Sequence, residues 1–216
     1  MSRAERAAER SPVMSRARSR TIQQTRDLVD AARRLIAVKG SSFTTQDLVK
    51  EAGVSMQTFY RHFAGKDQLL LAAIEDIVAE STEGYEQAAR ELPDPMARLR
   101  HHLLSVVAPL TDNPSLARFV TSEHWRLRER FPDEIAAADR PFVDLIERDL
   151  RAAQDAGLLP PSDSGRDAET IAQFAMSVFH HYAFARGPRP LDDLGDYLWD
   201  FCLGGISRSG VPSRTP

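Results

Sequence analysis

The chain has 216 residues, 42% of them hydrophobic and 27% charged, a composition typical of a folded protein with a sizeable core. No apolar run reaches the roughly 18 residues of a membrane-spanning helix, and the Arg-rich N-terminus lacks the apolar segment of a secretory signal. We therefore expect a cytoplasmic protein without a membrane partner. The single cysteine, Cys202, excludes an internal disulfide and a thiolate metal cluster.

Charge is divided unevenly along the chain. Residues 1–66 carry 13 Lys and Arg against 6 Asp and Glu, whereas the remaining 150 residues carry 15 against 25. A basic N-terminal part on an acidic body suggests that this part alone meets a polyanion such as nucleic acid, although a solvated Arg-rich tail would give the same balance.

The first elements are predicted from helical periodicity and from the residues that begin and end helices. Residues 1–20 contain six Arg and almost no large apolar side chain, so we expect a disordered basic arm. A helix with one apolar stripe follows and ends at Gly40. Thr44 and Asp47 resemble a capping box and start a second helix, which Gly53 ends.

The rest of the chain is also predicted to be helical, because no strand-length alternation of apolar and polar residues occurs. Ser55 caps a third helix over residues 56–62, and Lys66 opens a fourth. Proline, often with acidic residues beside it, marks the start of later helices. The pattern predicts an all-α protein of about nine helices. Its expected parts are a three-helix N-terminal domain over residues 21–66, a larger domain over residues 67–208 and a flexible tail over residues 209–216.

Residues 44–63, TTQDLVKEAGVSMQTFYRHF, have the spacing of a helix-turn-helix, with a tight turn at Gly53. The second helix of such a motif lies in the major groove of DNA. Once the apolar residues that hold the two helices together are set aside, the outer face is mostly polar and can hydrogen-bond to DNA. The candidate DNA-contacting residues are Thr44, Thr45, Gln46, Ser55, Met56, Gln57, Thr58, Tyr60, Arg61, His62 and Lys66.

The stretch AGVSMQTFYRHFAGKDQLL resembles the signature of the TetR family of repressors, roughly A-G-V-S-x-G-T-L-Y-x-H/Y-F-x-x-K-x-x-L. The resemblance is strong over about residues 22–75. It implies a homodimeric repressor that binds a palindromic DNA operator and is released by a small ligand. The matching residues are Ala52, Gly53, Val54, Ser55, Thr58, Tyr60, His62, Phe63, Lys66 and Leu69.

The resemblance also implies that Tyr60, His62 and Lys66 contact the phosphate backbone, as a lysine at a helix N-terminus is suited to do. Other roles are open for each side chain: Tyr60 could pack its ring, His62 could cap a helix or lie in solvent, and Arg61 could be a solvated charge. Gln57 departs from the family pattern, which often has a small residue there. Because glutamine can form a bidentate pair with adenine, we expect Gln57 to contribute to sequence specificity.

The last two predicted helices carry matching apolar stripes. Two such stripes can pack with their symmetry mates into a four-helix bundle across a two-fold axis, and the family resemblance implies dimerisation of this kind. The same stripes could instead serve only the internal core. The predicted interface residues are Ile171, Phe174, Val178, Tyr182, Leu194, Tyr197, Leu198 and Phe201.

Residues 99–182 hold more apolar side chains than a bundle seam needs. One explanation is a cavity for a small hydrophobic or amphipathic effector, with His101, His102 and His181 as nearby polar groups; a filled core is the other. The candidate lining residues are Leu103, Val107, Phe119, His124, Trp125, Phe142, Ile146 and Phe179.

We expect no cofactor, no metal and no catalytic site. The adjacent histidines at 101–102 and 180–181 point about 100° apart on a helix, so neither pair chelates one ion, although one histidine of each pair could join Glu123 or His124. A DNA-targeted enzyme such as a recombinase or nuclease would need clustered carboxylates or an activated nucleophile, and the body has neither. A regulator controlled by a protein partner stays open.

Overall fold

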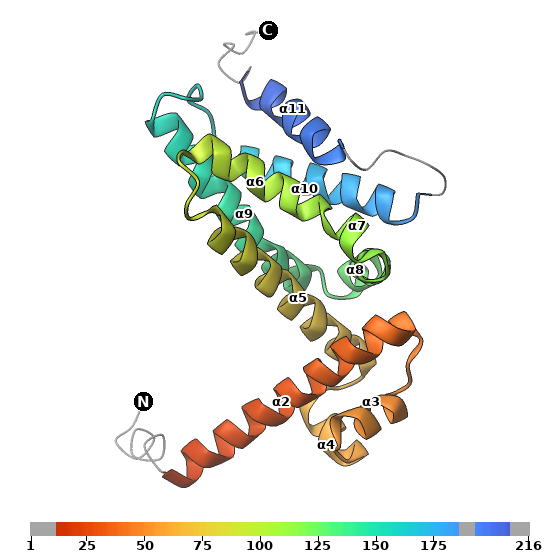
Figure 1. Ribbon diagram of the computed structural model, residues 1–216. Coiled ribbons are helices and arrows are strands. Elements are labelled where there is room, and N and C mark those ends of the chain that lie inside the picture. Colours follow the sequence, from red (N-terminus) through yellow and green to blue (C-terminus); the bar gives the residue numbers. More distant parts are fainter. Residues whose placement is uncertain (1–11, 186–192, 208–216) are drawn as a thin grey trace, which may run out of the picture. The chain divides into compact units, whose positions relative to one another are not determined.

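The computed structural model describes residues 12–185 and 193–207, and every element in these ranges is helical (Figure 1). The chain forms two compact units, Met1–Ala73 and Ile74–Pro216. The boundary between the two units falls inside helix α5 (Lys66–Ala89). The predicted all-α fold is confirmed. The described residues also contain a short helix, α7 (Pro109–Asp112), that the sequence pattern did not separate.

The N-terminal unit is built on a small apolar core. Leu28 on the first helix and Phe43 in the following turn are almost completely buried, as are Leu48 and Phe59 on the next two helices. The expected bounds of those two short helices are confirmed. The elements of this unit, besides the start of α5, are α2 (Pro12–Lys39), the 3-10 turn η1 (Gly40–Ser42), α3 (Thr45–Ala52) and α4 (Met56–His62).

One prediction for this unit was wrong: residues 12–20 are helical rather than disordered. Pro12 occupies the first position of α2, where proline is well tolerated, and the segment that follows contains the good helix formers Met, Ala and Arg. Growth of an existing helix is easy, so packing of the later turns of α2 extends it backwards. Residues 1–11 and the expected tail over 209–216 lie outside the described residues.

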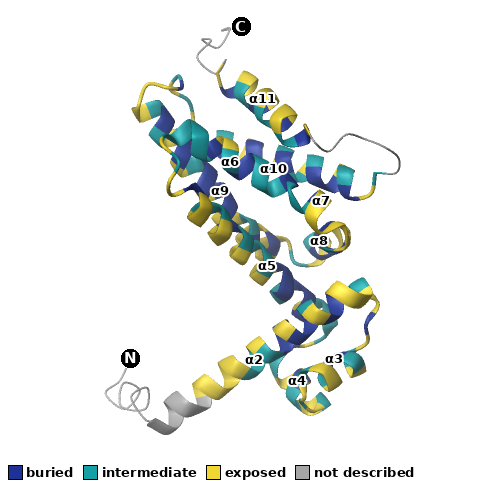
Figure 2. Ribbon diagram, in the orientation of Figure 1, coloured by how far each residue is buried: buried dark blue, intermediate teal, exposed yellow. Residues whose placement is uncertain are grey.

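The C-terminal unit consists of longer helices packed side by side. Helices α6, α9 and α10 lie against one another, and their facing sides carry the buried residues in Figure 2. Helix α8 packs on α9 and α10, and α11 packs mainly on α6. The elements, besides α7 and the rest of α5, are α6 (Pro95–Val107), α8 (Pro114–Arg130), α9 (Pro132–Asp155), α10 (Ser164–Ala183) and α11 (Leu194–Ile206).

The contact between α6 and α9 includes a buried polar cluster. Asp149 on α9 is 1% exposed; it accepts a hydrogen bond from Arg98 Nε at 2.8 Å and lies 3.0 Å from His102 Nε2 on α6. Burial alone would raise the pKa of Asp149, but the hydrogen bonds from His102 and Arg98 outweigh burial and lower it. The cluster therefore holds an ionised carboxylate inside the helix packing.

Candidate functional site

The helix-turn-helix is positioned by local caps. Thr44 accepts a hydrogen bond from the Asp47 backbone N–H through Oγ1, and the Thr44 backbone N–H donates to the Asp47 carboxylate at 2.8 Å, a complete capping box. The Thr44 backbone N–H and the Thr44 hydroxyl both donate to the Asp47 carboxylate and, helped by Lys39, lower its pKa to about 2. Gly53 ends α3 with a φ of 65°, a conformation that glycine adopts without strain.

Helix α4 turns one face inward and one outward. Ser55 Oγ accepts a hydrogen bond from the Thr58 backbone N–H and caps the helix, while Phe59 is fully buried. Gln57, Tyr60 and Arg61 are exposed, and Tyr60 has 58% of its surface accessible. Among the other candidates, Gln46 is exposed and Thr45 and Met56 are half-buried. The outward residues of α4 thus form one polar face.

Two candidates expected at the phosphate backbone are engaged within the chain. The ring of His62 is half-buried, with Nδ1 3.1 Å from Thr25 Oγ1 and Nε2 3.3 Å from Gln24 Oε1, both on α2. Lys66 Nζ donates to the Phe43 carbonyl at 2.5 Å and lies 4.3 Å from the centre of the Phe43 ring. Both side chains tie elements of the N-terminal unit together.

The C-terminal unit contains a cavity of about 490 Å³. Its wall comes from α5, α8, α9 and α10, with Val106 from α6 and Pro109 from α7. Four of the eight predicted lining residues belong to the wall: His124, Trp125, Phe142 and Phe179. The size and the largely apolar wall are those of a small-molecule site.

The other four predicted lining residues lie elsewhere. Leu103, Phe119 and Ile146 are buried outside the wall of this cavity, and Val107 borders a smaller cavity of about 210 Å³ beside the start of α11. Of the histidines proposed as polar groups, His102 is paired with Asp149 instead. Residue type does not distinguish these side chains from the ones that line the cavity. The difference between the two groups arises only from how the helices pack.

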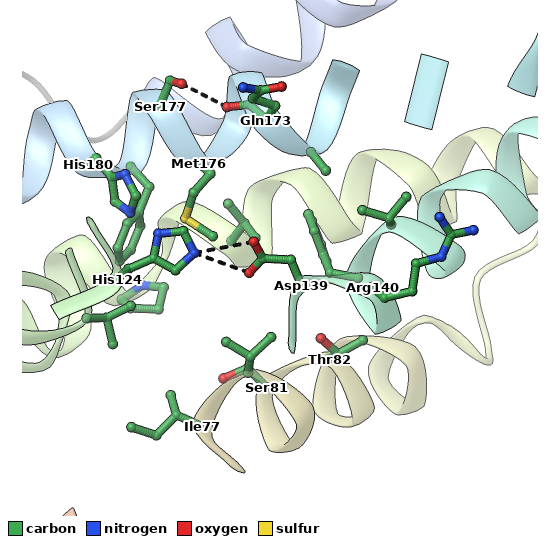
Figure 3. A pocket seen from close by; sticks show the side chains of 18 of the residues that line it. Ile77, Ser81, Thr82, His124, Asp139, Arg140, Gln173, Met176, Ser177 and His180 are labelled. Atoms are coloured by element: carbon green, nitrogen blue, oxygen red, sulfur yellow. Dashed lines mark hydrogen bonds and ion pairs between the residues drawn. The ribbon is translucent and has the colours of Figure 1, made fainter. Parts of the chain in front are cut away.

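The contributions of α5 and of most of α10 to the wall were not predicted from the sequence. Figure 3 shows Ile77, Ser81 and Thr82 reaching the cavity from α5. On α10 the wall includes Met176 and His180, which stand four residues apart. Residues four apart lie on one face of a helix, and this spacing was the sequence signal that could have predicted the α10 part of the wall.

One end of the cavity is polar. His124 Nε2 faces both carboxylate oxygens of Asp139, at 3.3 and 3.4 Å, and Arg128 Nη2 donates to the same carboxylate at 2.7 Å. His180 lies beside His124, with ring centroids 5.2 Å apart (Figure 3). Burial, more than the neighbouring charges, lowers the pKa of His180 to about 4. This end of the cavity thus holds the Arg128–Asp139 ion pair beside the neutral imidazole of His180.

The predicted interface residues of α10 and α11 divide into two groups. Ile171, Leu194 and Leu198 are buried within the chain. Tyr197 and Phe201 are exposed, by 66% and 58%, and the Phe201 ring stacks on Phe174 at 4.8 Å. The other two residues of the accessible group are the half-buried Val178 and Tyr182.

Two kinds of feature are absent from residues 12–185 and 193–207. None of their helices is long and apolar enough to cross a membrane. No three His, Cys, Asp or Glu side chains among them are grouped so that they could hold a metal ion.

Known proteins resemble this chain in sequence. Residues 28–73 match the family described as bacterial regulatory proteins, tetR family. The HTH-type transcriptional regulator EthR of Mycolicibacterium smegmatis is 30% identical over 144 residues, and the match covers 66% of each chain. The chain thus spans about two thirds of the length of this relative.

Solved structures share the fold over most of the chain. FadR of Thermus thermophilus, a TetR-family repressor in complex with lauroyl-CoA, superposes with a TM-score of 0.69 at 20% identity and covers 89% of this chain and 100% of its own. FadR of Bacillus subtilis in complex with stearoyl-CoA has a TM-score of 0.68 at 18% identity, covering 83% and 98%. With its helix-turn-helix, all-helical body and sequence matches, the chain belongs to the TetR family of DNA-binding transcriptional regulators, which is not a family of enzymes.

Proposed function

We propose that the protein is a cytoplasmic homodimeric repressor that binds a palindromic operator and is released by a small, largely apolar effector. The proposal that a small effector releases the repressor is supported by the cavity of about 490 Å³ in the C-terminal unit. A regulator controlled only by a protein partner has no need of such a cavity. The protein-partner alternative is therefore not favoured.

The polar face of α4 supports the DNA-binding part of the proposal. Gln57 is exposed in the first turn of this helix, where side chains of a recognition helix reach base edges. Tyr60 and Arg61, also exposed, are suited to phosphate contacts. Thr44 and Ser55 are exposed too, but their hydroxyls already cap α3 and α4. We therefore propose that they position these helices, in addition to any contact with DNA.

The effector and dimer parts rest on the C-terminal unit. Two structural neighbours bind lauroyl-CoA and stearoyl-CoA, molecules with long apolar chains, and the apolar wall of the cavity suits an apolar chain or ring. The exposed Tyr197 and Phe201 extend an aromatic surface from Phe174, and a second copy of the chain would remove it from water. Apolar surface of this kind is typical of an interface.

The first test selects bound sequences from a random duplex library and measures affinity for the selected duplex by fluorescence anisotropy at several salt concentrations. We expect a two-fold symmetric consensus and binding that weakens as salt rises. Gln57→Ala is expected to cost about 1–3 kcal/mol of binding free energy on the selected duplex and to relax preference at one base pair of each half-site.

Gln87→Ala is the matched control, because Gln87 is an exposed helical glutamine in the C-terminal unit. It should leave both affinity and base preference unchanged. A consensus without two-fold symmetry would contradict the dimeric operator. An unchanged base preference for Gln57→Ala would remove this residue from the base-contacting face and leave specificity to its neighbours.

A further inference from the structure

His180 on α10 is a buried polar group on the wall of the cavity. The residue is 8% exposed, and neither of its ring nitrogens has a hydrogen-bond partner. Buried polar atoms are nearly always hydrogen-bonded, because an unpaired donor or acceptor costs free energy. An unpaired imidazole at a cavity therefore indicates that the cavity takes up a group able to hydrogen-bond.

His124 on α8 supplies a second unpaired nitrogen at the same end of the cavity. Its Nε2 faces the Asp139 carboxylate at 3.3 and 3.4 Å, and because a carboxylate only accepts, Nε2 carries the proton. The other ring nitrogen, Nδ1, is buried without a partner. The rings of His124 and His180 lie 5.2 Å apart, so one ligand group can meet both (Figure 3).

Arg128 and Asp139, the charged side chains beside His180, already form an ion pair. Burial is the main cause that lowers the pKa of His180 to about 4, so its ring is neutral at pH 7 and holds one N–H donor and one acceptor. Arg128 contacts Asp139 at 2.7 Å. A charged ligand group would have to draw one member of this pair away from the other, whereas a neutral polar group needs only hydrogen bonds to the unpaired ring nitrogens.

We propose that His180 and His124 anchor a neutral hydroxyl group at one end of an otherwise apolar effector. The hydroxyl oxygen accepts a hydrogen bond from the N–H of His180, and the hydroxyl proton is donated to Nδ1 of His124. The apolar body of the effector lies against side chains such as Val78, Phe142 and Val143, which come from α5 and α9. The assignment rests on the proposed role of the cavity as the effector site.

Three probes with one apolar body and different head groups test this anchor: 4-butylphenol, butylbenzene and 4-butylbenzoate. Binding to the full chain is measured by titration calorimetry at neutral pH. We expect the phenol to bind about tenfold more tightly than either other probe, the effect of one well-made hydrogen bond. His180→Phe should reduce the preference for the phenol over butylbenzene to within about threefold, because a phenyl ring offers no partner.

His181→Phe is the matched control, since it makes the same substitution one residue later on α10, at an exposed side chain that is not on the wall of the cavity. It should keep the preference for the phenol, and thermal melting of each variant verifies its fold. Equal wild-type affinity for phenol and butylbenzene, or a preference retained by His180→Phe, would overturn the anchor and leave the cavity as an effector site.

Tighter binding of 4-butylbenzoate than of the phenol would overturn the neutral hydroxyl as the ligand class. Failure of all three probes to bind would overturn both the anchor and the effector role of the cavity. Operator binding, measured on the same preparation, tests the DNA-binding regulator separately, so the two failures are distinguishable.

Discussion

The two units of the molecule use polar side chains in opposite ways. In the N-terminal unit, the helix caps of the helix-turn-helix join residues three apart at the surface, as Thr44 with Asp47 and Ser55 with Thr58. In the C-terminal unit, buried or part-buried polar contacts join different helices, as His102 on α6 with Asp149 on α9 and His124 on α8 with Asp139 on α9.

This difference has an energetic consequence. An exposed cap competes with water, which can replace its hydrogen bond, so each one contributes little free energy. A buried polar group that loses its partner cannot turn to water and carries the full cost of desolvation. We therefore expect the largest effects of single polar substitutions in the C-terminal unit and the smallest in the N-terminal unit.

The largest effect is expected at Asp149. Asp149→Ala removes the acceptor that Arg98 and His102 share and leaves the buried nitrogen of His102 without a partner. We expect the free energy of unfolding of the C-terminal unit to fall by about 3–5 kcal/mol. Urea unfolding followed by the fluorescence of Trp125 and Trp199 measures this, because both tryptophans lie in that unit.

Asp144→Ala is the control for this prediction. Asp144 also lies on α9 and pairs with Arg140 at 2.6 Å, but both side chains are about half exposed, at 56% and 52%. An exposed ion pair contributes at most about 1 kcal/mol. A loss at Asp149 no larger than the loss at Asp144 would contradict the view that burial separates the two units.

A medium effect is expected from the protonation of His180. In the unfolded chain this residue binds a proton near the ordinary histidine pKa of 6.5, whereas in the folded chain burial lowers the pKa to about 4. The folded state is thus favoured above pH 6.5 and loses stability as the pH falls from 6.5 to about 4, by up to about 3 kcal/mol. His180→Phe should remove this part of the pH dependence.

The test compares urea midpoints of wild type and His180→Phe across this pH range, so that the contributions of His124, Arg128 and Asp139, present in both proteins, largely cancel. Met176→Leu, on the same face of α10, has no titratable group and should follow the wild type. Parallel pH profiles for wild type and His180→Phe would show that His180 takes up its proton equally well in the folded chain.

The same contrast between local and distant contacts explains what could be predicted from sequence. The bounds of α3 and α4 were predictable because Thr44, Gly53 and Ser55 begin and end helices through contacts with neighbours in the chain. The beginning of α2 was not, since residues 12–20 carry no apolar stripe and are helical by continuation of a helix that packs further on.

The cavity was only partly predictable because its wall depends on how six helices, α5 to α10, meet. Phe142 lines the cavity and Ile146, one turn later on the same helix, is buried in the core, although both belong to one apolar stripe. Of the adjacent histidines 180 and 181, His181 was named as a polar group near the cavity, but His180 is the one on the wall. A shift of one residue turns a helix by about 100°, and the sequence does not determine that angle.

The smallest effect is expected at Ser55, where stability and DNA binding can be separated. Ser55→Ala removes the acceptor for the Thr58 N–H and should weaken α4 locally by about 1 kcal/mol, seen as faster hydrogen exchange of its amides by mass spectrometry.

Ser55→Asp keeps a capping oxygen and adds a negative charge that suits a helix N-terminus, so slow exchange should be retained. The same charge would face DNA phosphates if α4 lies in the groove, so operator affinity should fall for Ser55→Asp more than for Ser55→Asn, which caps without charge. Equal operator affinity for the Asp and Asn variants would place Ser55 away from the DNA, and unchanged exchange in Ser55→Ala would mean that the cap does not stabilise α4.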